Sequence, residues 1–136
     1  MKFVVIGPTF PFRGGISHYT TLLVKHLRER HDVRFFSYRR QYPKWLFPGN
    51  VAADPSANTL YEPCERIIDT LNPLTWIATA RRVVAERPDI LLLQWWTPFW
   101  IPLLLIVSRA AHRAGIPVLY ISHQFIEPDS SLIEWF

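Results

Sequence analysis

The chain alternates short apolar runs with longer amphipathic stretches, and this alternation predicts a succession of strands and helices. Four apolar runs predict strands at residues 2–6, 33–38, 89–94 and 117–122. Three amphipathic stretches predict helices at residues 16–30, 73–87 and about 98–114, the last one beginning at Pro98 or Pro102. The run at 89–94 is apolar enough for burial on both faces, which is typical of parallel sheets. The order of elements therefore predicts an α/β fold, a parallel sheet with right-handed crossovers and helices on both faces.

Local signals mark the ends and the buried faces of these helices. Asn72 is the predicted N-cap of the second helix, Pro73 its first residue, and Gly115 the C′ residue after the third. The predicted buried stripe of the first helix consists of Ile16, Tyr19, Leu22, Leu23 and Leu27. The predicted stripe of the second helix consists of Trp76, Ile77, Ala80, Val83 and Val84.

Residues 39–63 form the longest predicted loop, rich in turn-forming residues, with a short strand expected at Leu60-Tyr61. The first part of this loop, residues 39–47, mixes cations with aromatic side chains. One hypothesis is that it touches an anionic membrane surface or a lipid-linked acceptor. The alternative is a loop that folds over the core. The cations of this part are Arg39, Arg40 and Lys44.

Composition and charge limit the classes to which the protein can belong. A length of 136 residues, 49% of them apolar, predicts a single domain over residues 1–136 with a real core. The net charge of +4 shows no clustered basic stripe, which argues against a nucleic-acid partner. The single cysteine, Cys64, excludes an internal disulfide and fits a reducing compartment.

The sequence shows neither a signal peptide nor a segment that is typical of a membrane-spanning helix. The N-terminus leads directly into a strand, without the pattern of a signal peptide. The apolar stretch 90–107 is interrupted by polar residues and prolines, so we interpret it as a buried strand followed by a buried helix. We therefore expect a cytoplasmic protein, free or peripheral at the inner face of the membrane.

The last residues carry a helix start that is not continued. Residues 131–134, Ser-Leu-Ile-Glu, fit a capping box, in which the serine and glutamate side chains satisfy each other's exposed amides. The chain ends within one turn of this start. We interpret it as a fragment, or as one half of a longer protein.

The loop after the first strand, residues 7–15, is the first candidate for chemistry. Gly14 and Gly15 stand before a predicted helix, where free amides and the positive dipole end suit a diphosphate. Arg13 either adds positive charge there or is a solvated loop residue. The spacing is neither that of dinucleotide-binding loops nor that of a P-loop, and a plain tight turn is the alternative.

A second candidate group lies after later strands, whose carboxyl ends share an edge with the first. His123 follows the last strand, and an imidazole there can hydrogen-bond or shift protons at neutral pH. Gln94 ends the strand at 89–94 and is followed by an aromatic run, which suits either a sugar-stacking surface or the core. His18 and Glu127 are further candidates for substrate binding, with a surface position as the alternative for each. No cluster of His, Cys or acidic residues points to a metal site.

Two of these segments resemble the N-terminal domain of a GT-B glycosyltransferase of the family 4 type. Residues 14–19, Gly-Gly-Ile-Ser-His-Tyr, with the leucines that follow, are similar to the family's first loop and helix. Residues 118–123, Val-Leu-Tyr-Ile-Ser-His, are similar to its strand that ends in a histidine facing the cleft between domains. The resemblance covers nearly all of the chain and implies a Rossmann-like domain, one half of a GT-B architecture.

The resemblance also implies an activity and a role for each site residue. It implies a retaining transferase that moves a sugar from a nucleotide-sugar donor to a glycan or lipid-linked acceptor, without cofactor or metal. His123 would act at the reaction centre, and Gly14, Gly15 and Arg13 at the donor phosphates. The residues expected to bind substrate are His18, Gln94 and Glu127.

The family's second domain, with its E-x7-E glutamates and most nucleotide contacts, has no counterpart in the sequence. Glu127 and Glu134 are seven positions apart, one short of that motif. We therefore expect the chain alone to be inactive, and polysaccharide biosynthesis is the expected context by analogy. One alternative is a non-catalytic Rossmann-like subunit that partners or anchors a separate catalytic half. Another is a stand-alone nucleotide-binding module.

Overall fold

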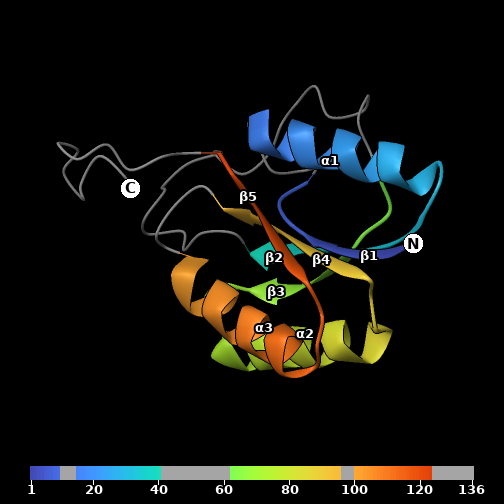
Figure 1. The fold of residues 1–136 in the computed structure, drawn as a ribbon. Coiled ribbons are helices and arrows are strands. Elements are labelled where there is room, and N and C mark those ends of the chain that lie inside the picture. The colour runs from blue at the N-terminus through green and yellow to red at the C-terminus, as the bar shows by residue number, and fades with distance from the viewer. Residues whose placement is uncertain (10–14, 41–61, 96–99, 124–136) are drawn as a thin grey trace, which may run out of the picture.

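The computed structural model describes residues 1–9, 15–40, 62–95 and 100–123, and these form a five-stranded parallel sheet flanked by helices (Figure 1). The strand order is β3-β2-β1-β4-β5. The elements are β1 (Lys2–Ile6), α1 (Gly15–Arg28), β2 (Asp32–Arg40), β3 (Glu65–Asp69), α2 (Pro73–Glu86), β4 (Ile90–Trp95), α3 (Ile101–Arg113) and β5 (Val118–Ser122). Helix α1 covers one face of the sheet, and α2 and α3 lie side by side on the other. The predicted α/β class with helices on both faces is confirmed.

The four strands predicted from apolar runs and the three predicted helices all occur, with ends displaced by a few residues, but one strand was missed. Strand β3 pairs in parallel with β2 at the edge of the sheet. Its sequence, Glu-Arg-Ile-Ile-Asp, lacks an apolar run because an edge strand is only half covered, and so pattern analysis gave no strand there. The strand expected at Leu60-Tyr61 lies outside the described residues.

The core consists of two layers, one on each face of the sheet, and the alternation of side chains along the strands divides them. In β1, Val4 and Ile6 point to the layer under α2 and α3, whereas Phe3 and Val5 point to the layer under α1. The first layer is the larger and includes Phe36, Tyr38, Leu91, Leu93, Val83, Trp100 and Leu103. The second includes Val24, Val33, Phe35 and Leu92.

The predicted buried stripe of α1 is wrong in part. Tyr19 and Leu22 are 44% and 41% exposed, whereas Ile16, Leu23 and Leu27 are half-buried. The positions that face the sheet are mostly small polar residues: Ser17, Thr20, Thr21 and Val24. Their hydroxyls can be buried because they donate to the preceding helical turn, as Thr20 Oγ1 does to the Ile16 carbonyl at 2.8 Å. Hydroxyl residues that satisfy themselves locally escape a search for apolar stripes.

In α2 the predicted stripe is confirmed at Ala80 and Val83, which are buried. Trp76 and Val84 are half-buried, and Ile77 is 43% exposed. Thr79 takes the buried position that was expected of Ile77, and its hydroxyl donates to the Thr75 carbonyl at 2.7 Å. The cause is the same as in α1.

The predicted helix ends are confirmed where the signals were chemical. Asn72 precedes α2 with extended backbone and its Oδ1 accepts from the Leu74 amide at 3.1 Å, while Pro73 is the first helical residue. Gly115 follows the C-cap of α3 with φ of +73°, a conformation that glycine adopts without strain. The apolar stretch 90–107 divides into β4 and α3, as expected. Among the residues described, none of the helices combines the length and apolarity needed to cross a bilayer.

Candidate functional site

The carboxyl ends of β1, β4 and β5 lie side by side and carry the site. The register pairs Ile6 with Leu93 and Trp95 with Ser122, so the residues that follow these positions meet at one edge. The His123 amide donates to the Trp95 carbonyl at 2.9 Å, which extends the β4–β5 ladder by one bond. The backbone of His123 is therefore fixed by the sheet rather than free in a loop.

The His123 ring is held by two side chains from other elements. Its Nε2 lies 2.5 Å from Oε1 of Gln94, in β4. It forms a T-shaped contact with the ring of Tyr19, in α1, with centroids 5.1 Å apart and planes at 78°. Burial lowers the pKa of His123 because desolvation disfavours the imidazolium. The ring is therefore neutral at physiological pH, with one nitrogen that donates a hydrogen bond and one that accepts.

Gln94 is fully buried, although it is the most polar residue of its strand. Its Oε1 is used by His123, while its Nε2 has no hydrogen-bond partner among the described residues. A buried amide nitrogen without a partner costs about 1–3 kcal/mol, so such groups occur where a ligand or water completes them. Gln94 thus offers a donor at the edge where ligands bind in open parallel sheets.

Gly7 gives Gln94 its space. A Cβ at Gly7 would lie 2.6 Å from Gln94 Cγ and 2.9 Å from Thr20 Cγ2, both closer than side chains approach. The backbone of Gly7 is fixed at the same time, because its amide donates to the Phe36 carbonyl and its carbonyl accepts from Ser37 Oγ at 2.8 Å. Any other residue would displace either α1 or Gln94.

The start of the first loop is attached to α1. The Thr9 and Thr21 hydroxyls are buried and lie 2.6 Å apart, within hydrogen-bond distance. Thr21 also donates to the Ser17 carbonyl at 2.7 Å, so in this pair Thr9 is the donor to Thr21. This contact holds the chain close to the helix as it leaves β1.

The structure brings together two of the residues predicted for the site and leaves others apart or outside. His123 and Gln94, 29 positions apart, are in contact. Gly15 is the first residue of α1, and His18 is exposed on the same helix. The remaining predicted site residues lie outside the described residues: Arg13, Gly14 and Glu127.

The aromatic run after β4 is only partly described. Trp95 is half-buried at the end of β4. Trp100 is buried and packs on Tyr38 with ring centroids 4.6 Å apart, so it belongs to the core, one of the two alternatives for this run. The residues between them lie outside the described part, as do the Lys44 position and most of the cationic aromatic segment.

Sequence analysis missed Tyr19 and Gly7 as members of the site. Tyr19 was assigned to the apolar stripe of its helix, and its exposure was the missing information. Gly7 was seen only as the start of the loop, although a glycine directly after a buried strand is a known sign of close approach between backbone and neighbours. Among the described residues, no three His, Cys, Asp or Glu side chains gather closely enough to hold a metal ion.

Comparison with known proteins adds a family. A family model described as a glycosyl transferase 4-like domain matches residues 14–136 of this chain. The match spans α1 to the end of the sheet, including Gln94 and His123. A search of curated proteins finds no match.

Proposed function

Because the chain belongs to the glycosyl transferase 4-like domain family, we propose that it is the acceptor-side half of a retaining GT-B glycosyltransferase. The family makes it a glycosyltransferase-type domain, and such domains bind a nucleotide sugar and an acceptor. In our proposal the sugar passes from a nucleotide-sugar donor to a glycan or lipid-linked acceptor. The nucleotide contacts come from a second domain that is not in the sequence given.

One observation carries the proposal: His123 is fixed at the carboxyl edge by Gln94 and Tyr19, beside the beginning of α1. Tyr19 lies four residues after Gly15, so the Tyr19 backbone is about one turn, ~6 Å along the axis, from the helix start. The free amides and dipole of a helix N-terminus favour a phosphate. A neutral imidazole near a phosphate-binding helix start suits a reaction in which a sugar leaves a diphosphate.

The roles of the residues follow from this arrangement. His123 hydrogen-bonds the transferred sugar or the acceptor hydroxyl at the reaction centre. Gly14 and Gly15 allow close approach of the donor phosphates, and Arg13 supplies positive charge there. His18, Gln94 and Glu127 bind substrate, and in this proposal the transfer needs neither metal nor cofactor.

The test is a transfer assay on the native polypeptide that contains this domain, with a panel of UDP- and GDP-sugars. His123→Ala is expected to lower kcat by about 10²–10⁴-fold, the usual contribution of a positioned acid or base. The matched control is His112→Ala, because His112 is an exposed histidine on α3, on the other face of the sheet. Unchanged transfer by the His123 variant would overturn the role of the ring.

The 136-residue chain alone is expected to show no transfer, because half of the cleft is absent. Melting experiments with the same nucleotide sugars distinguish the proposal from a stand-alone nucleotide-binding module. Tight binding by the isolated chain would favour that module, and rescue of transfer by a separate polypeptide would favour a non-catalytic subunit.

We propose peripheral membrane contact as a secondary feature, through the cationic aromatic segment 39–47. Arg39, the member of this segment whose side chain is described, is exposed. Removal of the charges at Arg39, Arg40 and Lys44 is expected to weaken binding to anionic liposomes, by about 1 kcal/mol per charge. Equal co-sedimentation of the native and variant proteins would exclude this contact.

A further inference from the structure

We propose that Gln94 is a positioning residue that holds His123 in one tautomer, with the proton on Nε2 and Nδ1 left as a hydrogen-bond acceptor for substrate. The contact between Gln94 and His123 does not depend on the reaction, whereas its effect on catalysis rests on the proposed function.

The first step is the rigidity of Gln94. Strand β4 lies between β1 and β5, so its backbone is hydrogen-bonded on both sides. The side chain is fully buried and lies so close to Gly7 that a methyl group there would be 2.6 Å from the Gln94 Cγ. An amide held in this way presents its oxygen at a fixed place rather than following the ring.

The second step is the chemistry of the contact. An amide oxygen accepts hydrogen bonds and donates none, so the imidazole nitrogen 2.5 Å from it is the donor. A neutral imidazole carries one N–H, and placing it on Nε2 leaves the lone pair on Nδ1. A partner on one nitrogen thus decides what the other nitrogen can do.

The third step is the surroundings of the ring. Strand β4 presents the Gln94 amide to the ring, and α1 presents the Tyr19 ring. Among the residues described, no carboxylate contacts the His123 ring. Burial also lowers the pKa of the ring, so the neutral form, for which tautomers matter, is the one present near pH 7.

The fourth step is what the arrangement offers a ligand. Nδ1 of His123 is an acceptor, and Nε2 of Gln94 is a buried donor without a partner among the described residues. A sugar hydroxyl both donates and accepts, so it matches such a pair. The same Gln94 side chain therefore orients the imidazole with its oxygen and keeps a buried donor on its nitrogen.

The experiment is a long-range 1H–15N spectrum of the histidine rings in the native polypeptide that contains this domain. The sequence given holds five histidines, and His123→Ala identifies the signals of the ring in question. The expected spectrum shows the Nε2–H tautomer for His123. A spectrum of the Nδ1–H tautomer, or of two tautomers in exchange, would overturn the proposal.

Two substitutions sharpen the test. Gln94→Glu keeps the shape and the acceptor but adds negative charge, so the Nε2–H tautomer persists and the pKa of His123 rises by about 1–3 units. Gln94→Leu removes the acceptor, so the ring populates both tautomers. An unchanged tautomer in the folded Leu variant, or an unchanged pKa in the Glu variant, would show that Gln94 does not position the ring.

The matched control is Thr79→Val, which removes a buried hydroxyl on the other face of the sheet and leaves the His123 spectrum unchanged. If the Leu variant does not fold, the native spectrum and the Glu variant still decide the question. In the transfer assay, Gln94→Leu lowers kcat by about tenfold to a hundredfold, as loss of an orienting partner does elsewhere, and also raises KM because the Nε2 donor is lost. Gln94→Glu moves the pH profile upward with the pKa of the ring. A correct tautomer with no effect on transfer would contradict the proposed function and leave the positioning intact.

Discussion

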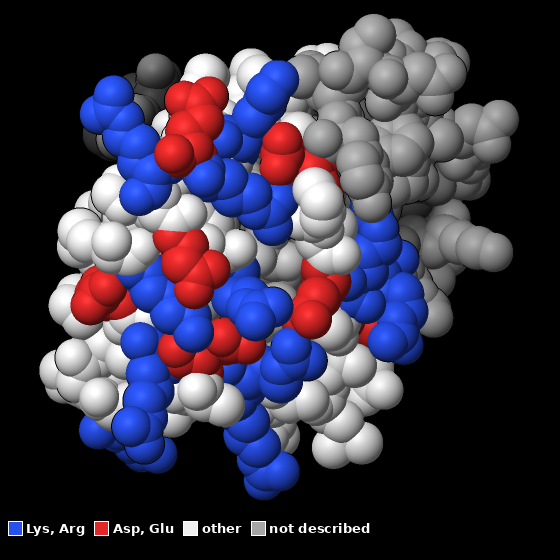
Figure 2. All heavy atoms as spheres, turned by 90° about the vertical axis from the view of Figure 1, so that its right-hand side faces the viewer, with Lys and Arg blue, Asp and Glu red and all other residues white. Residues whose placement is uncertain are grey.

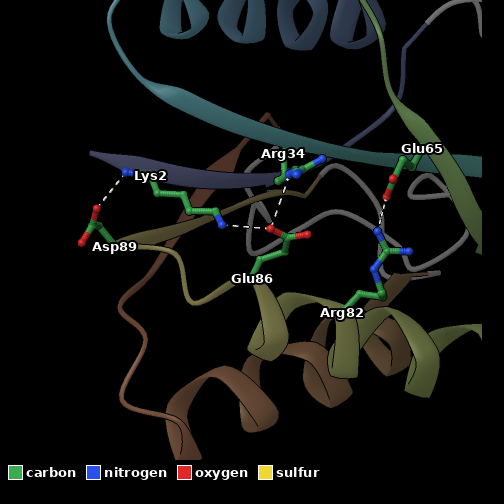
Figure 3. A network of polar contacts seen from close by, with 6 residues as sticks. All are labelled: Lys2, Arg34, Glu65, Arg82, Glu86 and Asp89. Atoms are coloured by element: carbon green, nitrogen blue, oxygen red, sulfur yellow. Dashed lines mark hydrogen bonds and ion pairs between the residues drawn. The ribbon is translucent and has the colours of Figure 1, made fainter.

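The carboxyl and amino ends of the strands differ in the polar groups that they carry. Around the carboxyl ends of β1 and β4 lies a group of uncharged, buried polar residues: Thr9, Thr20, Thr21, Ser37 and Gln94. At the amino edge the polar groups are charged and partly exposed, and they pair with one another (Figure 3). Figure 2 looks onto the amino side and shows lysine and arginine side chains interspersed with acidic ones.

The amino edge is satisfied within itself. Glu86 lies 2.9 Å from Lys2 Nζ and 3.4 Å from Arg34 Nε, so α2 is attached to both β1 and β2. Asp89, before β4, accepts from the Lys2 backbone amide at 2.7 Å. Each of the two acidic side chains, Glu86 and Asp89, therefore has a partner within the protein.

The carboxyl edge has a buried donor without a partner among the described residues, the Nε2 of Gln94, beside the half-buried imidazole of His123. Charges that neutralise each other stabilise a fold but do not select a ligand. Uncharged groups that are held rigidly and shielded from solvent can select a ligand, because water does not weaken their hydrogen bonds. The comparison is therefore consistent with a structural role for the amino edge and with the proposed ligand site at the carboxyl edge.

The largest effect on stability is expected for Gly7→Ala, at the carboxyl edge. The new Cβ would lie 2.6 Å from Gln94 Cγ and 2.9 Å from Thr20 Cγ2, within tightly packed surroundings. We expect a loss of about 1–3 kcal/mol in the free energy of unfolding, measured by urea denaturation. Gly115→Asn is the control, because its Cβ has open space and asparagine tolerates the positive φ. An equal or larger loss at Gly115 would show that packing around Gly7 is looser than described.

A smaller effect is expected for Asp89→Ala, at the amino edge. The change leaves the Lys2 amide without its acceptor, but water can reach this exposed bond and replace it. We expect a loss of about 1 kcal/mol in the free energy of unfolding and no change in sugar transfer. Asp89→Asn retains an oxygen acceptor and should recover most of the loss. A drop in transfer for a folded Asp89→Ala variant would break the division between the edges.

Most of the fold could be predicted because its signals are local. Apolar runs gave four strands, and Asn72, Pro73 and Gly115 gave helix ends through backbone chemistry that needs no tertiary partner. Strand β3 could not be predicted from Glu65 to Asp69, because its pairing with β2, not its own pattern, makes it a strand. The exposed Tyr19 was misplaced since only tertiary packing turned small hydroxyl residues inward.

The location of the candidate site, at the carboxyl ends of the strands, could be predicted, but the contacts between its residues could not. The carboxyl ends of parallel strands meet whatever their sequence, so Gln94 and His123 could be placed near each other. Their hydrogen bond depends on the register of β4 with β5, and the role of Gly7 depends on the distance to Gln94 and Thr20. Neither is encoded in a spacing along the chain.

A pH-dependent contribution to stability is expected from Glu86. The hydrogen bond from Lys2, with the charges of Arg34 and Lys2, holds the pKa of Glu86 below its ordinary value of 4.5. A carboxyl whose pKa is lowered on folding stabilises the native state above its unfolded pKa and loses this contribution as pH falls through the folded pKa. Glu86→Gln is therefore expected to cost about 0.5–1 kcal/mol at pH 7 and much less at pH 3.

Urea denaturation of both proteins at the two pH values measures this difference. Glu29→Gln is the control, because the Glu29 side chain is 62% exposed and its partner, His26, is 70% exposed. An equal cost for Glu86→Gln at pH 7 and pH 3 would show that the network contributes through packing rather than charge.

The smallest effect is expected for the pair of Glu65 and Arg82, which bridges β3 and α2. Arg82 Nη2 lies 2.5 Å from Glu65 Oε2, but the side chains of Glu65 and Arg82 are 44% and 45% exposed. Water and salt therefore screen their attraction. A double-mutant cycle with alanine should give a coupling of about 0.2–0.5 kcal/mol.

The two single substitutions should nevertheless differ in cost, because the Arg82 guanidinium also lies 5.3 Å from the centroid of the buried Phe36 ring. Arg82→Ala should therefore cost about 0.5–1 kcal/mol more than Glu65→Ala. Equal costs with a strong coupling would mean that ion pairs, rather than contact with the core, hold α2 against this end of the sheet.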